Sequence, residues 1–284
     1  LLSAREVGVL TGSARYCGGL LDRRGGTVQP LSYVRGLARA VARAGGQICV
    51  HSPALHLRRA AREWRIETPQ GAVTAATVIV ATNAYSDALV GVLRRSIITV
   101  PSFQVATVPL TTAQRAQILP GGQAASDTWH LLRYFRVDAT GRLVLGARGT
   151  FGQVPGPRSC RHHYRAVLDI YPHLAGVAFE YHWGGLVAMT RDHLPHLHEL
   201  APGLLAGLGY NGRGVAMATL MGRLLAQRTL GMSDAELAFP VTPVRPIPFH
   251  RASRLGARAA IQYLRAVDGL ARIQTRLRGG QSWT

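Results

Sequence analysis

Lysine is absent from this sequence: all 33 basic residues are arginine, and with 14 acidic residues the formal net charge is +19. The absence excludes a P-loop nucleotide-triphosphate site, because the Gly-x-x-x-x-Gly-Lys motif requires its lysine. The arginines are scattered and not gathered into a basic arm with interleaved aromatic residues, so nucleic-acid binding is not expected. A few of the arginines could instead bind an anionic substrate or a cofactor phosphate.

Other absences narrow the function further. The three cysteines, Cys17, Cys49 and Cys160, share no metal or redox spacing, which favours a reducing, cytoplasmic environment. No apolar run approaches ~18 residues, so neither a membrane span nor a signal peptide is expected. The hydrolase motif Gly-x-Ser-x-Gly is missing. His193, His196 and His198 lie close together but lack carboxylate or cysteine support, and Pro195 breaks any helix that would align them, so we expect no metal site.

What is present indicates a mixed α and β protein. At 284 residues with 47% apolar composition there is room for two domains. Apolar residues recur at helical spacing after Pro30, and Gly45-Gly46 provides a C-terminal cap, which predicts a helix. Residues 64–68 and 73–82 read as strands. The second ends in an apolar run typical of a buried parallel strand, and Asn83 after it favours a sharp left-handed turn where such sheets bind ligands.

From about residue 97 the pattern loses its βαβ rhythm. We expect strands over 100–110, 131–137 and 143–147, with the hairpin turn Asp138–Gly141 between the last two. A helix over 161–170 and a strand over 179–183 follow. These elements predict an inserted antiparallel domain.

The glycine-rich segment 203–226 is the strongest single feature. An apolar run, four glycines within eight residues and a helical apolar pattern predict a strand, a tight turn and a helix. The helix N-terminus would favour an anionic or carbonyl-rich ligand over the turn, although the glycines also fit a simple turn between a core strand and a core helix. Beyond it, the prolines of 240–248 predict an extended strap, and Leu255, Ala259, Tyr263, Val267 and Leu270 predict a basic amphipathic helix.

Several motifs in this order resemble one enzyme family. They are Ala81-Thr-Asn-Ala-Tyr-Ser-Asp87, Leu131-Leu-Arg-Tyr-Phe-Arg136, Leu145-Gly-Ala-Arg-Gly149, Trp183-Gly-Gly185, and Gly209-Tyr-Asn-Gly-Arg-Gly-Val-Ala-Met-Ala218. From about Gly18 to Pro248 the chain resembles the flavin-dependent amine and amino-acid oxidoreductases, which include glycine oxidase, sarcosine oxidase and D-amino-acid oxidase. The gamma-glutamylputrescine oxidoreductase branch is the most similar.

The resemblance implies an α/β (α+β) fold in which a partial FAD-binding Rossmann-like domain carries an inserted antiparallel-sheet substrate domain. It implies that a hydride passes from a carbon beside a substrate nitrogen to N5 of FAD. The residues implied to contact FAD are Ala81, Thr82, Asn83, Gly207, Gly209, Gly212 and Gly214. Those implied to face the substrate are His130, Leu132 and Val187. No catalytic side chain is assigned, because the flavin carries the chemistry.

Four departures from the family pattern shape these expectations. The Gly-x-Gly-x-x-Gly pyrophosphate loop is missing and the sequence begins with Leu1, which predicts the carboxyl-terminal two-thirds of such an enzyme. Val187 stands where glycine oxidase places a carboxylate-binding arginine, so an amine or polyamine derivative is the expected substrate. No cysteine lies between 184 and 195, so FAD is expected to be non-covalent. The oxygen-activating lysine of the family is absent, which leaves oxidase and dehydrogenase open.

The predicted organisation has four parts: a partial FAD-binding domain (1–95), a substrate-binding antiparallel domain (96–200), a return to the FAD-binding domain (201–232), and the strap with its C-terminal helix (233–284). The favoured hypothesis is an FAD-dependent amine oxidoreductase, with an inactive fragment as an open outcome. The alternatives are a non-catalytic remnant or a subunit whose partner chain supplies the missing dinucleotide-binding half, and a basic protein that binds nucleic acid or a membrane surface.

Overall fold

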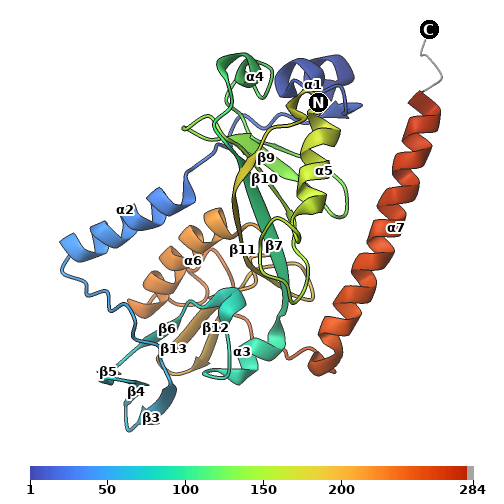
Figure 1. Cartoon of the computed structure of the whole chain (residues 1–284). Helices are drawn as coiled ribbons and strands as arrows, with labels where there is room; N and C mark the ends of the chain where they lie inside the picture. The colour runs from blue at the N-terminus through green and yellow to red at the C-terminus, as the bar shows by residue number, and fades with distance from the viewer. Residues whose placement is uncertain (280–284) are drawn as a thin grey trace. The chain divides into compact units, whose positions relative to one another are not determined.

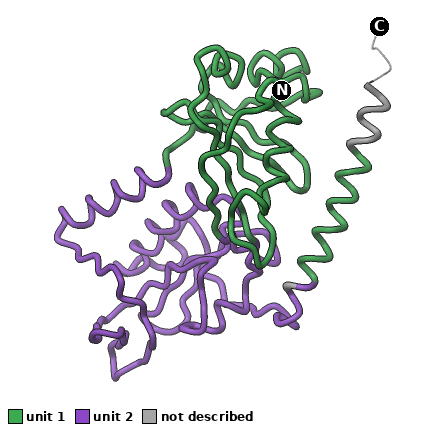
Figure 2. Tube along the Cα trace, viewed as in Figure 1, with its two compact units in different colours: residues 1–29, 101–185, 256–284 green, residues 30–100, 186–255 purple. Residues whose placement is uncertain are grey.

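The computed structural model describes residues 1–279, which divide between two compact units (Figure 2). The first unit holds residues 1–29, 101–185 and 256 onwards, and the second holds 30–100 and 186–255. Residues 280–284, part of the predicted final segment, lie outside the described residues. The units thus divide after 29, 100, 185 and 255, and the predicted boundaries lie at 96, 201 and 233. Which part binds FAD and which binds substrate stays a prediction.

A five-stranded sheet organises the first unit, in the order β11-β7-β10-β9-β8 (Figure 1). The strands are β7 (Ile98–Thr107), β8 (Ala125–Ser126), β9 (Tyr134–Val137), β10 (Leu143–Arg148) and β11 (Phe179–Met189). β10 pairs antiparallel with both β7 and β9, and β8 pairs antiparallel with β9. The predicted turn is confirmed, since Gly141 has a φ of 80° and its N–H donates to the Asp138 carbonyl at 3.0 Å. The predicted antiparallel sheet is therefore present, while its role as a separate substrate domain stays a prediction.

The core of this unit forms between the sheet and α5 (Arg161–Ile170), a helix predicted over the same residues. Val167 and Ile170 pack with the strand residues Phe103, Leu143 and Leu145, and all five are at most 3% exposed. Burying each such side chain contributes about 1.5–3 kcal/mol, so this layer is the main source of stability in the unit.

One core residue of α5 titrates. His163 is fully buried, and its Nε2 lies 3.0 Å from the Phe103 carbonyl oxygen. Burial, and secondarily the neighbouring His162, lower the pKa of His163 from 6.5 to about 4. In the unfolded chain the His163 imidazole is therefore protonated near pH 6.5, whereas in the folded chain it is protonated only near pH 4. The stabilising effect is complete above pH 6.5 and is lost as the pH falls, by an amount of order 3 kcal/mol.

We expect His163→Gln to flatten the pH dependence of the unfolding free energy between pH 6.5 and about pH 4, measured by urea unfolding. The glutamine amide can still donate to the Phe103 carbonyl, so the loss of the titrating group is isolated from the loss of the hydrogen bond. The matched control is His56→Gln, because His56 is exposed. A wild-type curve as flat as that of His163→Gln would contradict the expectation.

The first residues of the chain form a short helix and a pair of short strands. Residues 1–25 show no pattern, yet α1 (Ala4–Thr11) forms there, and β1 (Leu2–Ser3) pairs with β2 (Gly18–Gly19). The helix begins with a capping box in which Ser3 Oγ accepts from the Glu6 N–H at 3.3 Å and the Ser3 N–H donates to Glu6 Oε2 at 2.7 Å. Two turns are too short to show a periodic signal, so the Ser-x-x-Glu spacing was the available signal.

Two three-stranded sheets organise the second unit. One has the order β12-β13-β6, from β6 (Val78–Val80), β12 (His196–Ala201) and β13 (Leu204–Leu208), and the other comprises β3 (His56–Ala60), β4 (Glu63–Thr68) and β5 (Gly71–Ala75). β13 pairs parallel with β6, which confirms the predicted parallel strand. The strand predicted over 73–82 is in fact two strands, because β5 pairs with β4 and only β6 joins the parallel sheet.

The helices of this unit are α2 (Pro30–Arg43), α3 (Gly91–Ser96) and α6 (Gly214–Thr229). α2 begins at the predicted proline, and Gly45 after it has the left-handed φ of 85° expected of its cap. All of β13 is buried, and Met221, Leu224 and Leu225 of α6 pack in one cluster with Leu205. The predicted succession of strand, glycine turn and helix is therefore confirmed.

The end of the chain forms a long helix, α7 (Ser253–Gly279), where an amphipathic helix was predicted. Between Val241 and His250 the chain has no helix or strand, in agreement with the predicted strap. Within the described residues, no helix combines the length and apolar character needed to cross a membrane.

Candidate functional site

The carboxyl ends of β6 and β13 lie at the same edge of their sheet, since these two neighbouring strands are parallel. Asn83 follows β6 with a φ of 44°, and its Oδ1 accepts the N–H of Gly209, which follows β13, at 2.9 Å. Ala81 and Thr82 are exposed beside it. We call this edge, with the loop Gly209–Gly214, the strand-end site.

Asn211 holds the loop of the strand-end site in shape. It has a φ of 49°, and its N–H donates to the Ala188 carbonyl at 3.1 Å. Its Oδ1 accepts the Thr190 N–H at 2.9 Å, and its Nδ2 donates to Thr190 Oγ1 at 3.0 Å and to the Gly209 carbonyl. Sequence reasoning missed Asn211 and Thr190, although an asparagine between glycines is a signal for a left-handed turn.

The glycines at positions 207, 209, 212 and 214 serve two purposes. A Cβ at Gly207 would lie 2.4 Å from Met221 Cγ, and one at Gly209 would lie 2.2 Å from Thr190 Cγ2, so these two glycines permit internal packing. Gly209 and Gly212 also have φ values of 79° and 88°, which favour glycine. A Cβ at Gly212 would meet nothing within 4 Å, and one at Gly214 would meet only Tyr210 Cδ2 at 3.9 Å. Gly212 and Gly214 therefore leave open space at the start of α6.

The N-terminus of α6 adds a favourable potential to that space. The residue before the helix, Arg213, makes no side-chain capping hydrogen bond, and the first hydrogen bond of the helix is from the Met217 N–H to the Arg213 carbonyl. The N–H groups of the first turn therefore point out of the helix, and with the helix dipole they favour an anionic or carbonyl oxygen. Open space plus these donors fits the edge of a flavin ring system.

Val187 belongs to the same unit as the strand-end site and is half-buried in β11. Its neighbours in sequence are both tied to the site: the Leu186 N–H donates to the Tyr85 hydroxyl at 3.1 Å, and the Ala188 carbonyl accepts from Asn211. The structure thus brings Val187 together with Ala81, Thr82, Asn83 and the glycines.

His130 and Leu132 lie in the first unit, and the predicted strand over 131–137 is wrong at its start. β9 begins at Tyr134, so both residues lie in the preceding loop. The backbone there bonds to side chains and not to a neighbouring strand: the His130 and Leu131 N–H groups donate to the Asp268 carboxylate at 3.3 and 3.1 Å. His130 Nδ1 lies 2.8 Å from Asp268 Oδ1, and Leu132 is 44% exposed.

A polar cluster that sequence reasoning missed lies on the five-stranded sheet of the first unit. Ser102 Oγ lies 2.9 Å from the Tyr134 hydroxyl, and Gln104 Nε2 donates to that hydroxyl at 2.6 Å. Gly146 pairs with both Gln104 and Tyr134, and a Cβ there would lie 2.1 Å from the Tyr134 ring. A glycine in mid-strand was the available signal for this close approach. The cluster offers hydroxyl and amide groups for a polar ligand.

His196 and His198, on one side of Pro195, use ring nitrogens within the protein. His196 Nε2 lies 3.0 Å from Asp192 Oδ1, and His198 Nδ1 lies 2.6 Å from the Thr242 carbonyl. Burial lowers the pKa of His198 despite that bond, so its ring is neutral at neutral pH. Across residues 1–279, no three or more His, Cys, Asp or Glu side chains are placed to hold a metal ion.

Comparison with known proteins shows which family this chain belongs to. The family described as FAD dependent oxidoreductase (DAO) matches residues 1–228. The chain belongs to this family. The cofactor of this family is FAD, and the open space at Gly212 and Gly214 before α6 is compatible with a bound flavin.

Two relatives and one solved structure illustrate the family. The chain is 35% identical to "Probable oxidoreductase OrdL" of Rhizobium meliloti over 78% of its length and 51% of that protein. It is 30% identical to "Gamma-glutamylputrescine oxidoreductase" of Escherichia coli over 90% of its length and 60% of that protein. Glycine oxidase from Geobacillus kaustophilus shares the fold, with a TM-score of 0.72, 19% identity, and coverage of 87% of this chain and 66% of that one. The chain thus spans about half to two-thirds of the length of these FAD dependent oxidoreductase relatives.

Proposed function

We propose that this protein oxidises the CH–NH group of an amine, such as a gamma-glutamyl polyamine. The observation that carries the proposal is the strand-end site: an uncapped helix N-terminus beside two glycines that leave open space, in a chain of the FAD dependent oxidoreductase family. Bound FAD would supply the hydride acceptor at N5. The relative named for gamma-glutamylputrescine supports the choice of amine.

The residues of this chain would bind FAD and fix its orientation. Gly212, Gly214 and the first turn of α6 would receive the flavin edge and stabilise negative charge on it. Asn83 and Asn211 would fix the loop through their bonds to Gly209 and Thr190. FAD would be held without a covalent bond, since residues 184–195 contain no cysteine.

Substrate selection would rest on Val187, which offers no positive charge to a carboxylate. An amine whose oxidised carbon bears no carboxylate is therefore preferred over glycine, in which that carbon bears one.

The test uses protein expressed from its complete reading frame. Under anaerobic conditions, gamma-glutamylputrescine is expected to bleach the flavin absorbance and glycine is not. Denaturation is expected to release free FAD into the filtrate. In Val187→Arg, bleaching by an amino acid is expected to increase relative to the amine. A protein that stays colourless with added FAD, or a flavoprotein reduced by glycine and not by the amine, would overturn the proposal.

A further inference from the structure

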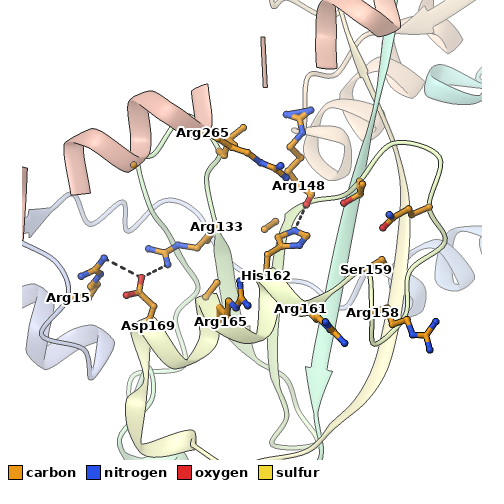
Figure 3. A pocket seen from close by; sticks show the side chains of 16 residues that line it. Arg15, Arg133, Arg148, Arg158, Ser159, Arg161, His162, Arg165, Asp169 and Arg265 are labelled. Atoms are coloured by element: carbon orange, nitrogen blue, oxygen red, sulfur yellow. Dashed lines mark hydrogen bonds and ion pairs between the residues drawn. The ribbon is translucent and has the colours of Figure 1, made fainter. Parts of the chain in front are cut away.

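A second site lies in the first unit, between α5, the loop after β10 and α7. It is a cavity of about 840 Å³ that we call the arginine cavity (Figure 3). Arg15, Arg133, Arg148 and Arg265 line it from four separate segments, and Arg158, Arg161 and Arg165 line it from the loop and α5. The strand-end site belongs to the other unit, so the proposed function does not use these residues.

The lining carries a large excess of positive charge. Asp169 is its one acidic residue, against seven arginines. That carboxylate is already occupied, because its Oδ2 accepts from Arg133 Nη1 at 2.9 Å and lies 3.3 Å from Arg15 Nη2. Across the described part of the chain, no carboxylate lies within 4.0 Å of the nitrogens of the other five arginines. The repulsion among them is unbalanced by protein groups.

Two buried nitrogens of the cavity lack partners. Arg133 Nη2 and Arg148 Nε are buried without a hydrogen bond within the described residues, and the Arg133 side chain is only 5% exposed. Burial, and secondarily the charge of Arg265, lower the pKa of Arg148 to about 10. Figure 3 shows Arg148 and Arg265 close together at the wall of the cavity. Unpaired, buried charged donors are costly, so this arrangement favours a negative group that the protein itself does not supply.

We propose that the arginine cavity binds a small oxyanion that carries at least two negative charges. Guanidinium groups present paired N–H donors that match the oxygens of phosphate and carboxylate groups, and several of them from different directions suit a multivalent ligand. The pyrophosphate of a phosphorylated metabolite and a tricarboxylate share this chemistry. The cavity has a buried floor at Arg133 and no Phe, Tyr or Trp in its lining, which favours a compact anion over a stacked nucleic acid.

The C-terminal helix forms part of the wall. Arg265 and Gly269 of α7 line the cavity. Between them, Asp268 is 4% exposed and accepts hydrogen bonds from the loop that precedes β9, including the Leu131 N–H. Leu131 itself lines the cavity. An anion bound to Arg148 and Arg265 therefore links β10 to α7 and would hold the helix in place.

The experiment measures binding of pyrophosphate and of citrate to the full-length protein by isothermal titration calorimetry at low ionic strength, in separate arms that distinguish the two ligand sources. Arg148→Gln and Arg265→Gln are each expected to weaken binding by about ten-fold or more, because each removes hydrogen bonds to a charged group. Arg133 is left intact, since its bonds to Asp127 and Asp169 belong to the fold. Arg23→Gln is the matched control, because Arg23 is exposed and does not line the cavity.

A second readout is independent of affinity. Pyrophosphate is expected to slow trypsin cleavage within α7 in the wild type and not in Arg265→Gln. If neither pyrophosphate nor citrate binds, the proposal is overturned. It is also overturned if Arg23→Gln and Arg148→Gln lose equal affinity, because equal losses would indicate a general attraction of polyanions to a basic surface. A duplex DNA that competes with pyrophosphate and depends on Arg23 as strongly as on Arg148 would likewise replace the small-anion site with nucleic-acid binding. Flavin content is expected to stay the same in all three variants.

Discussion

Gly214→Glu is expected to fold as the wild type does and to bind FAD at least about 100-fold more weakly, a loss of about 2.7 kcal/mol. The Cβ of residue 214 enters open space, and a glutamate in the first turn of α6 is favourable for the helix dipole. The same side chain fills the space proposed for the flavin edge and brings negative charge to it. Thermal unfolding without FAD and fluorescence titration with FAD separate the two effects.

Two further variants sharpen this result. Gly214→Gln adds a similar volume without charge, so it divides the loss between steric exclusion and repulsion. Gly222→Glu is the matched control on the same helix, because a Cβ at Gly222 meets nothing within 4 Å. If Gly214→Glu retains wild-type FAD affinity, α6 does not begin at the flavin, and the proposed site is wrong.

Asp127→Ala is expected to lower the free energy of unfolding by about 3–5 kcal/mol. The Asp127 side chain is 2% exposed, its Oδ2 accepts from Arg133 Nε at 2.6 Å, and its Oδ1 accepts from the Arg133 N–H at 2.8 Å. The bonds to Asp127 and Asp169 together outweigh burial, the largest single effect, and raise the pKa of Arg133. Removal of Asp127 leaves a buried guanidinium with Asp169 as its one remaining carboxylate, which is itself shared with Arg15.

Urea unfolding followed by circular dichroism measures this loss. The matched control in the same unit is Asp22→Ala, which breaks an exposed ion pair with Arg24 and is expected to leave the free energy of unfolding nearly unchanged. A loss below about 1 kcal/mol in Asp127→Ala would mean that Arg133 finds another partner or water. The same comparison tests whether the floor of the arginine cavity is as rigid as its contacts indicate.

Local pattern was sufficient for the elements that carry strong signals. The apolar run at Leu204–Leu208 and the glycines after it predicted β13, the turn and α6, because a buried strand and a left-handed turn restrict which residues fit. Asn83 was predicted to turn sharply after a parallel strand, and its φ of 44° agrees. The helix at Pro30 and the hairpin at Gly141 follow from caps and turn residues in the same way.

Contacts between distant residues were beyond such reasoning. The strand predicted before the turn Asp138–Gly141 would place His130 and Leu132 on one face of a hairpin, but Asp268, 138 residues away from His130, accepts the backbone N–H groups there. Thr190 and Asn211 are joined across 21 residues, and nothing local marks threonine as the partner. The arginine cavity gathers residues from Arg15 to Arg265 that the sequence shows only as scattered charge.

The position of α7 makes the arginine cavity depend on the last part of the chain. α7 begins at Ser253, and within one turn of that helix Asp268 bonds to the loop that precedes β9, while Arg265 and Gly269 complete the wall of the cavity. Removal of the chain from Ser253 onwards would therefore open the cavity, while the strand-end site, which belongs to the other unit, would keep all of its residues.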